Sequence, residues 1–437
     1  MTVLKPQKIA NERSSLLKAL DRYWPNGSEA VAALPIVAWE MQRSESLPPA
    51  CESIALPEWA EEMSVDGGLL IPRWAFLLAE GEWAKVDWFA VCFWYLHNLA
   101  ERAYEDANGP IHSYAFRLKG WDSRLWARAW VNRIALFLRR WAVRESGKDE
   151  DELLGPLPET EIVLTHDVDA IEKTLAIRLK QTAFHGFNAI RFLCCFRLGQ
   201  SFQRAFRAFH FLLSRENYWC FDQILELERS HGVKSRFHFY AGKMARGTRL
   251  KKWLMDPAYD VHEKRLSEQI VDLRKKKCEV GLHQSFDAWS DRDYMREEKS
   301  NLEQALGEEV TTCRQHWLRF SFRDTWKTQQ EVGFQQDATL GFNDRSAFRN
   351  GAALAFNPIH VGYENQLDFV AFPMVLMDSH LYDYHSFQAE ERNRELSRWL
   401  DEIKAVRGQA TIIWHQRVMS EDYGWAEGYE QLLSKLT

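Results

Sequence analysis

The amino-acid sequence predicts an α/β fold, with β–α units around a parallel sheet or barrel, preceded by a mainly helical N-terminal domain. Two observations carry this prediction. After residue 160, short apolar runs typical of strands alternate with stretches of helical period, which indicates β–α units around a parallel sheet or barrel. Before residue 144, helical segments dominate, and the connections between them are rich in Trp and Pro.

The N-terminal region contains its clearest predicted helices around residues 88–104 and 123–143, where apolar residues recur with a period near 3.6. Residues 145–161 follow, with seven acidic residues, one Lys, two Gly and two Pro. This composition predicts a linker that contributes little to a core. We therefore expect an accessory domain over residues 1–155 and the barrel over residues 156–437.

The barrel region contains a series of candidate strands and helices. The candidate strands are residues 162–165, 235–240, 280–283, 315–320, 369–377 and 411–414. Helical period is clear at residues 220–231, 261–277 and 390–406. This order is that of repeated β–α units.

The composition excludes several classes of protein. The chain has 437 residues, of which 46% are hydrophobic and 27% charged, as in soluble globular proteins. A formal net charge of −6 does not indicate a nucleic-acid binder. No secretory leader is visible, and the longest uncharged helical stretch, residues 88–100, is shorter than the about 20 residues of a spanning helix. Seven cysteines without a CxxC pair predict reduced thiols in a cytoplasmic protein.

Four candidate strands end in Asp or His. Residues 162–165 lead into His166, Asp167 and Asp169, while residues 280–282 lead into His283. Residues 313–315 lead into His316, and residues 411–414 lead into His415. In β–α barrels the active site gathers at the carboxyl ends of the strands. We therefore expect these side chains to meet.

These residue types suit metal-assisted hydrolysis. The two carboxylates of an Asp-x-Asp sequence leave a strand on the same side, so one can ligate a metal while the other contacts its bound water. Imidazole and carboxylate ligands suit zinc or another divalent first-row ion. Such an ion polarises a carbonyl and lowers the pKa of bound water, which is the equipment needed to hydrolyse an amide or an ester.

The same residues resemble the polysaccharide deacetylase family, carbohydrate esterase family 4. The resemblance covers residues 160–437 and its motifs follow the family order: VLTHDVD at 163–169, EVGLHQSF at 279–286, RQHWLRF at 314–320, DATLGF at 337–342, FRNG at 348–351, and Trp414–His415. Residues 88–142 look like the domain that precedes the barrel in a bacterial subgroup tied to surface polysaccharide synthesis.

The resemblance implies that the barrel is a distorted (β/α) barrel of the polysaccharide deacetylase type, and it implies a role for each matching residue. Asp167 corresponds to the catalytic base, and Asp169 and His283 to metal ligands. Arg349 corresponds to the arginine that orients the base or grips substrate, and His415 to the general acid.

One position departs from the family pattern. The usual second metal histidine, four residues after the first, is replaced by Asp287. Either Asp287 ligates through oxygen, or His316 ligates from the next strand. We expect His316, because imidazole is a common ligand and this residue ends its own strand.

Structural roles compete with these functional ones. Asp167 and Asp169 could cap a following helix, and His415 could be a strand-end histidine with its hydrogen bonds satisfied. Arg349 could be the ion-pair partner of Asp337. We expect His166 to pack or to orient a neighbour.

Residues 173–215 hold eight Lys and Arg residues and no acid. Phe202, Phe206, Phe209 and Leu213 fall on one helical face, with Arg204, Arg207 and Arg215 on the other. This pattern is typical of a helix at an anionic membrane surface. The alternative is a barrel-surface helix that buries its apolar stripe within the fold.

Together these features predict a zinc-dependent hydrolase that removes N-acetyl groups from a glycan in bacterial surface polysaccharide metabolism. An inactive deacetylase-like protein that binds glycan or acts as a scaffold, and a hydrolase of a non-sugar amide, remain alternatives. We expect no nucleic-acid partner, and we expect a cytoplasmic location with peripheral contact at the inner membrane face.

Overall fold

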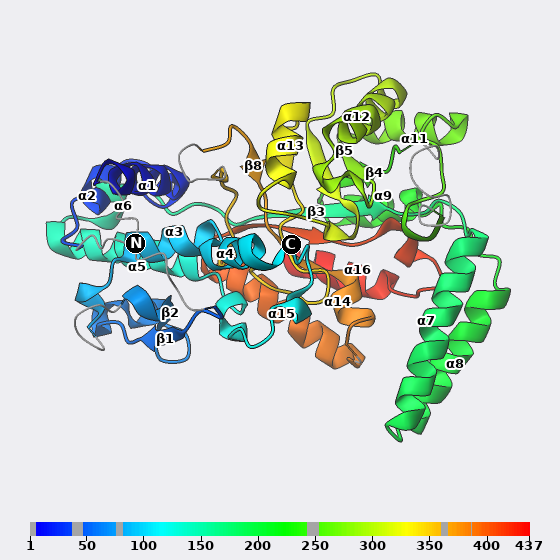
Figure 1. Cartoon of the computed structure of the whole chain (residues 1–437), viewed down its shortest axis with the longest axis horizontal. Helices are drawn as coiled ribbons and strands as arrows, with labels where there is room; N and C mark the ends of the chain where they lie inside the picture. The colour runs from blue at the N-terminus through cyan, green and yellow to red at the C-terminus, as the bar shows by residue number, and fades with distance from the viewer. Residues whose placement is uncertain (1–5, 37–46, 76–81, 243–252, 360–365, 386) are drawn as a thin grey trace. The chain divides into compact units, whose positions relative to one another are not determined.

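A computed structural model describes residues 6–36, 47–75, 82–242, 253–359, 366–385 and 387–437 (Figure 1). The chain divides into two compact units. Unit 1 comprises Met1–Val163 and Trp317–Ile412, and unit 2 comprises Leu164–His316 and Ile413–Thr437. Each unit is made of segments that are distant in sequence, so this division does not test the predicted domain boundary at residue 155.

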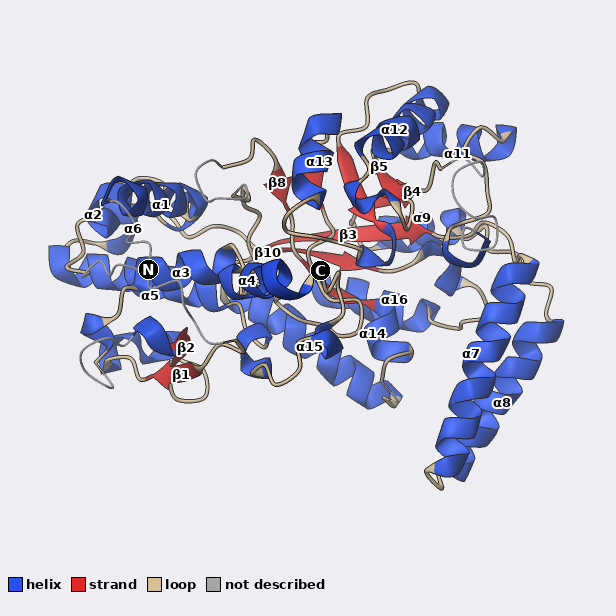
Figure 2. Cartoon of the chain, in the orientation of Figure 1, coloured by secondary structure: helices blue, strands red, loops and turns tan. Residues whose placement is uncertain are grey.

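The main sheet confirms the predicted α/β fold class. Its eight strands have the order β8-β7-β6-β5-β4-β3-β10-β9 (red in Figure 2). The strands are β3 (Glu161–Val168), β4 (Ser235–Phe239), β5 (Glu279–Gln284), β6 (Thr312–Gln315), β7 (Gln336–Asp337), β8 (Val370–Ala371), β9 (Met374–Met377) and β10 (Gln409–Ile413). Strands β3 to β6 pair in parallel, as do β7 and β8. The result is the curled sheet of a distorted (β/α) barrel.

The predicted strand at residues 315–320 is wrong. Strand β6 ends at Gln315, and a 3-10 turn at His316–Leu318 follows. Trp317 and Leu318 have φ values of 57° and 48°, a left-handed backbone that cannot continue an extended strand. The run at 369–377 is divided between β8 and β9, with Pro373, which has no N–H to donate, between them.

Unit 2 builds its helices around strands β3 to β6. They are α7 (Leu175–Cys194), α8 (Leu198–Leu213), α9 (Phe221–Ser230), α11 (Lys264–Lys275), α12 (Arg292–Leu306) and α16 (Ala426–Leu436). Local sequence sets their ends: the Asp291 carboxylate accepts from the Tyr294 N–H at the start of α12, and Gly307 (φ 79°) ends it. Leu266, Ile270 and Leu273 of α11 are buried at helical spacing.

Unit 1 is largely helical outside its short strands. It contains α1 (Pro6–Ala19), α2 (Ser28–Ala32), α3 (Trp88–Leu96), α4 (Leu99–Asn108), α5 (Trp130–Ser146), α6 (Glu150–Leu154), α13 (Thr325–Val332), α14 (Asp378–Tyr382), α15 (Ala389–Ala405), and the antiparallel pair β1 (Cys51–Ile54) and β2 (Leu69–Pro72). Phe137 is buried against Trp59, Trp83, Trp88 and Trp141, with ring centroids 5.1–5.8 Å away. This aromatic core uses several of the 19 Trp residues.

Two predictions for unit 1 need correction. The helix predicted at residues 88–104 is divided into α3 and α4, because Asn98 has a left-handed backbone (φ 52°). The acidic segment at 145–161 is not merely a linker. It includes α6, whose Leu154 is fully buried, and the Glu150 carboxylate there accepts a 2.5 Å hydrogen bond from Arg139 Nε.

No helix within the described residues combines the length and the hydrophobicity needed to cross a membrane.

Candidate metal centre

The polar residues of unit 2 share one face of strands β3 to β6. Side chains alternate along a strand, so Asp167 and Asp169 point the same way. Asp167 lies opposite His238 of β4, and His283 of β5 lies opposite Arg314 of β6. The parallel register therefore brings residues that are far apart in sequence into one buried layer.

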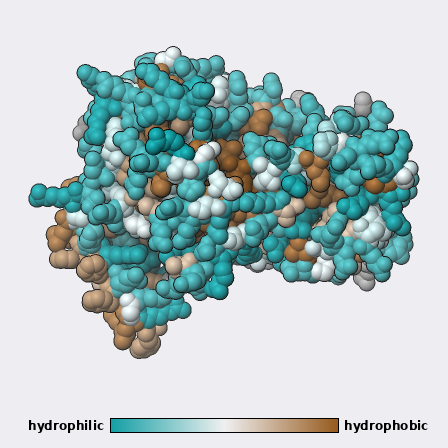
Figure 3. Space-filling view, turned by 180° about the vertical axis from the view of Figure 1, so that it is seen from behind, coloured by the Kyte–Doolittle hydropathy of each residue, from teal (hydrophilic) through white to brown (hydrophobic). Residues whose placement is uncertain are grey.

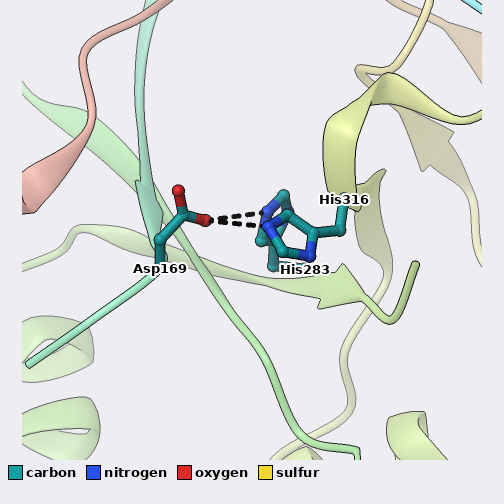
Figure 4. A group of neighbouring side chains, drawn as sticks. All are labelled: Asp169, His283 and His316. Atoms are coloured by element: carbon teal, nitrogen blue, oxygen red, sulfur yellow. Dashed lines mark ion pairs between the residues drawn. The ribbon is translucent and has the colours of Figure 1, made fainter. Parts of the chain in front are cut away.

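Three predicted ligands converge. One potential ligand atom from each of Asp169, His283 and His316 lies within 4.8 Å of those of the other two (Figure 4). Asp169 Oδ1 lies 3.3 Å from His283 Nε2 and 3.5 Å from His316 Nε2. The three residues are at most 9% exposed. The structure therefore groups His316, and not Asp287, with the two other predicted ligands.

This donor set fits a divalent metal ion. Asp169 Oδ1 is buried and accepts no hydrogen bond of acceptable geometry from the described residues, although two imidazole nitrogens face it. Buried polar atoms are normally satisfied, so this oxygen lacks a partner that a cation would supply. One carboxylate and two imidazoles are the ligand types that zinc and related ions prefer, with coordination positions left for water.

Asp256 supports the His316 ligand from behind. The Oδ1 atom of Asp256 lies 3.5 Å from His316 Nδ1 and accepts a 2.8 Å hydrogen bond from the Phe286 N–H. A carboxylate at the far nitrogen of a metal-binding imidazole fixes its tautomer and its ring orientation. Sequence reasoning missed Asp256, because it comes from the connection after β4 and follows no candidate strand.

The second oxygen of Asp169 faces two cationic or titratable groups. Arg417 Nη1 donates a hydrogen bond to Asp169 Oδ2, and His415 Nε2 lies 3.7 Å from the same oxygen. Burial acts to raise the pKa of Asp169, but the Arg417 guanidinium and then the neighbouring histidines lower it. The balance holds the pKa well below its usual range, so Asp169 is a carboxylate.

Asp167 is held by Arg314 and His238. Arg314 Nη1 donates to Asp167 Oδ1 at 2.9 Å and to Thr165 Oγ1 at 2.7 Å, and His238 Nδ1 lies 3.3 Å from the same Asp167 oxygen. Burial acts to raise the pKa of Asp167, but Arg314, and then His283 and His238, hold it well below its usual range. Asp167 Oδ2 lies 4.0 Å from His283 Nδ1, beside the metal ligands.

Arg314 makes the contact with Asp167 that was predicted for Arg349. In unit 1 the Arg349 guanidinium is ion-paired with buried Glu101 and donates to Ser113 Oγ and to the carbonyl oxygens of Gly341 and His112. A role for Arg349 toward Asp167 stays a prediction. Arg314 could have been found from the sequence, because it comes two residues before His316 at the end of a strand, as Asp167 comes two residues before Asp169.

His166 has the positioning role expected of it. Its ring is fully buried, with Nδ1 2.6 Å from the Trp414 carbonyl oxygen and Nε2 2.9 Å from Glu228 Oε1. Tyr429 donates to the same Glu228 oxygen at 2.6 Å. This network ties the end of β3 to the residue that precedes His415.

Comparison with known proteins gives similarity in structure alone. No protein-family model matches the sequence, and no curated protein sequence matches it. A putative polysaccharide deacetylase from Mycobacterium smegmatis is 16% identical, with 64% of this chain and 85% of that chain covered and a TM-score of 0.39. Puue allantoinase is 11% identical, with 64% and 88% covered and a TM-score of 0.37.

A third similar structure is a carbohydrate esterase family 4 pseudoenzyme from Bacillus anthracis. It is 12% identical, with 65% of this chain and 66% of that chain covered and a TM-score of 0.31. Polysaccharide deacetylases are thus among the similar solved structures. At these identities and TM-scores the similarity assigns no activity.

Proposed function

We propose that this protein is a metal-dependent hydrolase that removes N-acetyl groups from a glycan of bacterial surface polysaccharide metabolism. The observation that carries the proposal is the convergence of Asp169, His283 and His316 beside Asp167, a second buried carboxylate. One carboxylate for the metal and another for the water are the parts that amide hydrolysis requires.

Asp169, His283 and His316 would hold the ion, which we take to be zinc from the two imidazole ligands. When bound, it would polarise the acetyl carbonyl group and lower the pKa of a water molecule. Asp256 would keep the His316 ring oriented for ligation.

Asp167 is the proposed general base. It removes a proton from water as the water oxygen bonds to the acetyl carbonyl carbon. Arg314 and His238 keep Asp167 ionised and hold its Oδ1 atom, which leaves Oδ2 toward the metal ligands. Arg314 is a positioning residue in this scheme, since it acts through Asp167.

His415 is the proposed general acid. It gives a proton to the amine nitrogen as the carbon–nitrogen bond breaks, so that acetate and a free amino sugar leave. Its imidazole lies 3.7 Å from Asp169 and is 16% exposed, so it can exchange protons with solvent between turnovers. The seven free cysteines support a cytoplasmic location for this reaction.

Metal content and acetate release test the proposal. The purified chain should hold one divalent ion per molecule and release acetate from N-acetylated oligosaccharides. Asp167→Asn should keep the ion and lose at least about a hundredfold in kcat. Asp287→Asn, at the alternative ligand position, is the matched control and should keep both. A protein that binds no ion after reloading, or an active Asp167→Asn variant, would contradict the proposal.

A non-catalytic glycan-binding protein is the second candidate. The ion pair between Arg417 and Asp169 favours it, because a guanidinium compensates the carboxylate without a metal ion. Asp287, in place of a family histidine, also favours it. In that case the chain would bind N-acetylated oligosaccharides without releasing acetate, and Arg417→Gln would not create metal binding.

A further inference from the structure

Helices α7 and α8 form an antiparallel hairpin, residues 173–215, whose outer surface is apolar. The helices lie side by side and extend away from strands β3 to β6 of the same unit (Figure 1). Thirteen of the seventeen exposed large hydrophobic residues among the described residues belong to it: Leu175, Leu179, Phe184, Phe187, Ile190, Leu193, Phe196, Leu198, Phe202, Phe206, Phe209, Leu212 and Leu213. Figure 3 shows this surface in brown and tan at lower left. Contiguous exposed apolar surface of this kind marks an interaction site.

The turn of the hairpin presents a phenylalanine to solvent. Phe196 is 91% exposed and has a φ of 57°, a left-handed backbone that is unfavourable for a bulky residue. Glycine would adopt this conformation without strain. Phe196, the most exposed aromatic side chain among the described residues, therefore lies where the backbone conformation favours glycine. This indicates that the phenylalanine serves a function other than folding.

The charge of the hairpin has one sign. Its eight Lys and Arg residues are accompanied by no Asp or Glu, although the whole chain has a net charge of −6. Arg191 and Arg197 are exposed on either side of the turn. Arg204, predicted to lie with Arg207 and Arg215 on the face opposite the phenylalanines, is buried between the two helices. Its Nη1 atom lies 3.3 Å from His185 Nδ1. Exposed basic residues therefore lie at the turn and, with Lys180 and Arg215, toward the base, but they do not include Arg204.

The base of the hairpin is firmly attached to unit 2. Lys173 Nζ lies 2.7 Å from Asp422 Oδ2, both side chains being buried, and Tyr218 donates to the same oxygen at 2.8 Å. The Phe211 ring packs against Tyr423 with ring centroids 5.2 Å apart. Because the base is tied down by these contacts, the hairpin can hold its apolar turn in a defined position.

We propose that the α7–α8 hairpin docks on an anionic lipid bilayer, with its apolar side chains in the boundary between headgroups and acyl chains. Apolar residues cover both helices and the turn, so the occupant must offer an apolar medium on several sides, as a bilayer does and a one-sided protein groove does not. Arg191 and Arg197 would meet lipid phosphates. The acidic remainder of the chain is repelled by an anionic surface, so only the hairpin faces it.

The base of the hairpin is connected to the candidate metal centre. The segment that follows β10 contacts Asp169 through Arg417 and contacts the hairpin base through Asp422 and Tyr423. The lipid proposal does not depend on catalysis, because it rests on the surface of the hairpin alone.

Vesicle flotation of the full-length protein tests the proposal. We expect flotation with phosphatidylcholine vesicles that contain about one third phosphatidylglycerol, and about tenfold less with pure phosphatidylcholine. The triple variant Phe202→Ser, Phe206→Ser, Phe209→Ser should lose about tenfold or more in binding, because it removes three exposed aromatic side chains without touching the core. Phe116→Ser, at an equally exposed aromatic residue in unit 1, is the matched control and should bind normally.

Two further measurements sharpen the result. Arg191→Gln with Arg197→Gln should weaken binding to the anionic vesicles and reduce its salt dependence. A polarity-sensitive dye on exposed Cys194 or Cys195, next to the turn, should shift its emission to the blue on these vesicles. Failure to bind anionic vesicles at any salt concentration, or unchanged binding by the triple Phe variant, would overturn the proposal. The proposal would also be overturned if the protein did not bind vesicles but self-associated, and if the triple variant abolished that self-association. The hairpin surface would then be occupied by a second copy of the chain.

Discussion

The metal centre and the α7–α8 hairpin depart in opposite ways from the usual partition of residues in a soluble protein. At the centre, the charged residues Asp167, Asp169 and Arg314 are buried. On the hairpin, Phe196 and Phe202 are 91% and 77% exposed. Buried charge opposes folding through its desolvation, and apolar surface that stays exposed contributes none of the stabilisation that its burial would give.

The two regions differ in how the buried charges and the exposed apolar side chains are accommodated. At the centre, ion pairs and hydrogen bonds hold Asp167 and Arg314, whereas Asp169 Oδ1, His283 Nδ1 and His238 Nε2 have no hydrogen-bond partner among the described residues. On the hairpin, nothing among the described residues covers the exposed apolar side chains. We take these groups in each region as marks of a ligand, and we propose a cation for the first region and a lipid surface for the second.

Removal of Arg314 should have the largest effect. Arg314→Met leaves Asp167 buried without its guanidinium, so we expect a loss of about 3–5 kcal/mol in the free energy of unfolding and at least a hundredfold lower kcat in the molecules that remain folded, about the scale of a lost general base. Arg314→Lys should restore part of both. Chemical denaturation and acetate release measure the two effects. Full activity in folded Arg314→Met would show that Asp167 needs no such partner.

Removal of Arg349 should affect stability alone. Arg349→Met leaves Glu101 buried and unpaired in unit 1, which should cost about 3–5 kcal/mol. Activity per folded molecule should be unchanged, and adding Glu101→Gln should recover part of the stability. A fall of kcat in the folded fraction would instead support the prediction that Arg349 orients the catalytic base or grips substrate.

Loss of the Asp256 carboxylate should weaken metal binding. Asp256→Asn removes the negative charge beside His316 Nδ1 and should raise the Kd for zinc by about 10–100-fold, as other changes behind metal ligands do. Calorimetric titration of the metal-free chain measures this change. Asp260→Asn, four residues away on the same connection, is the control. An unchanged Kd would mean that His316 is oriented by other contacts.

The hairpin should loosen in acid. Burial, with help from Arg204 and Arg207, lowers the pKa of His185 from 6.5 to about 4, so the folded hairpin keeps this imidazole neutral. The unfolded hairpin takes up a proton below pH 6.5, so this contribution to stability is complete above pH 6.5 and is lost as the pH falls toward 4. Hydrogen-exchange protection of α7 should decline over this range and should decline less in His185→Gln. Equal slopes in both proteins would exclude His185 as the cause.

The smallest effect is expected at the hairpin turn. Phe196→Gly relieves a left-handed backbone at an exposed residue, so the free energy of unfolding should stay the same or rise by at most about 1 kcal/mol. Vesicle binding should nevertheless fall, because the variant removes the most exposed aromatic side chain. Thermal denaturation and flotation, done together, measure both. A clear loss of stability would show that Phe196 serves the fold.

Much of the fold and part of the site could be predicted from the sequence. Strands β3, β4, β5 and β10 lie where alternating patterns and helical stretches predict them, because hydrophobic period is a local property. The strand predicted at 315–320 is wrong, because Trp317 and Leu318 adopt a left-handed backbone and no glycine in the sequence indicates it. The acidic segment at 145–161 was predicted to be a linker, but Arg139, a buried arginine of α5, pairs with its Glu150. The sequence of the segment alone does not show this distant partner.

The sequence by itself determined which residue types follow the strands, and so the chemistry available to Asp167, Asp169, His283 and His316. Tertiary structure alone decided which of them meet and which partners they have. Arg314 reaches Asp167 through the register of parallel strands, and Asp256 reaches His316 from a distant connection. The physical reason is that ligation and ion pairing depend on distances of a few ångströms, and the packing of the sheet sets those distances.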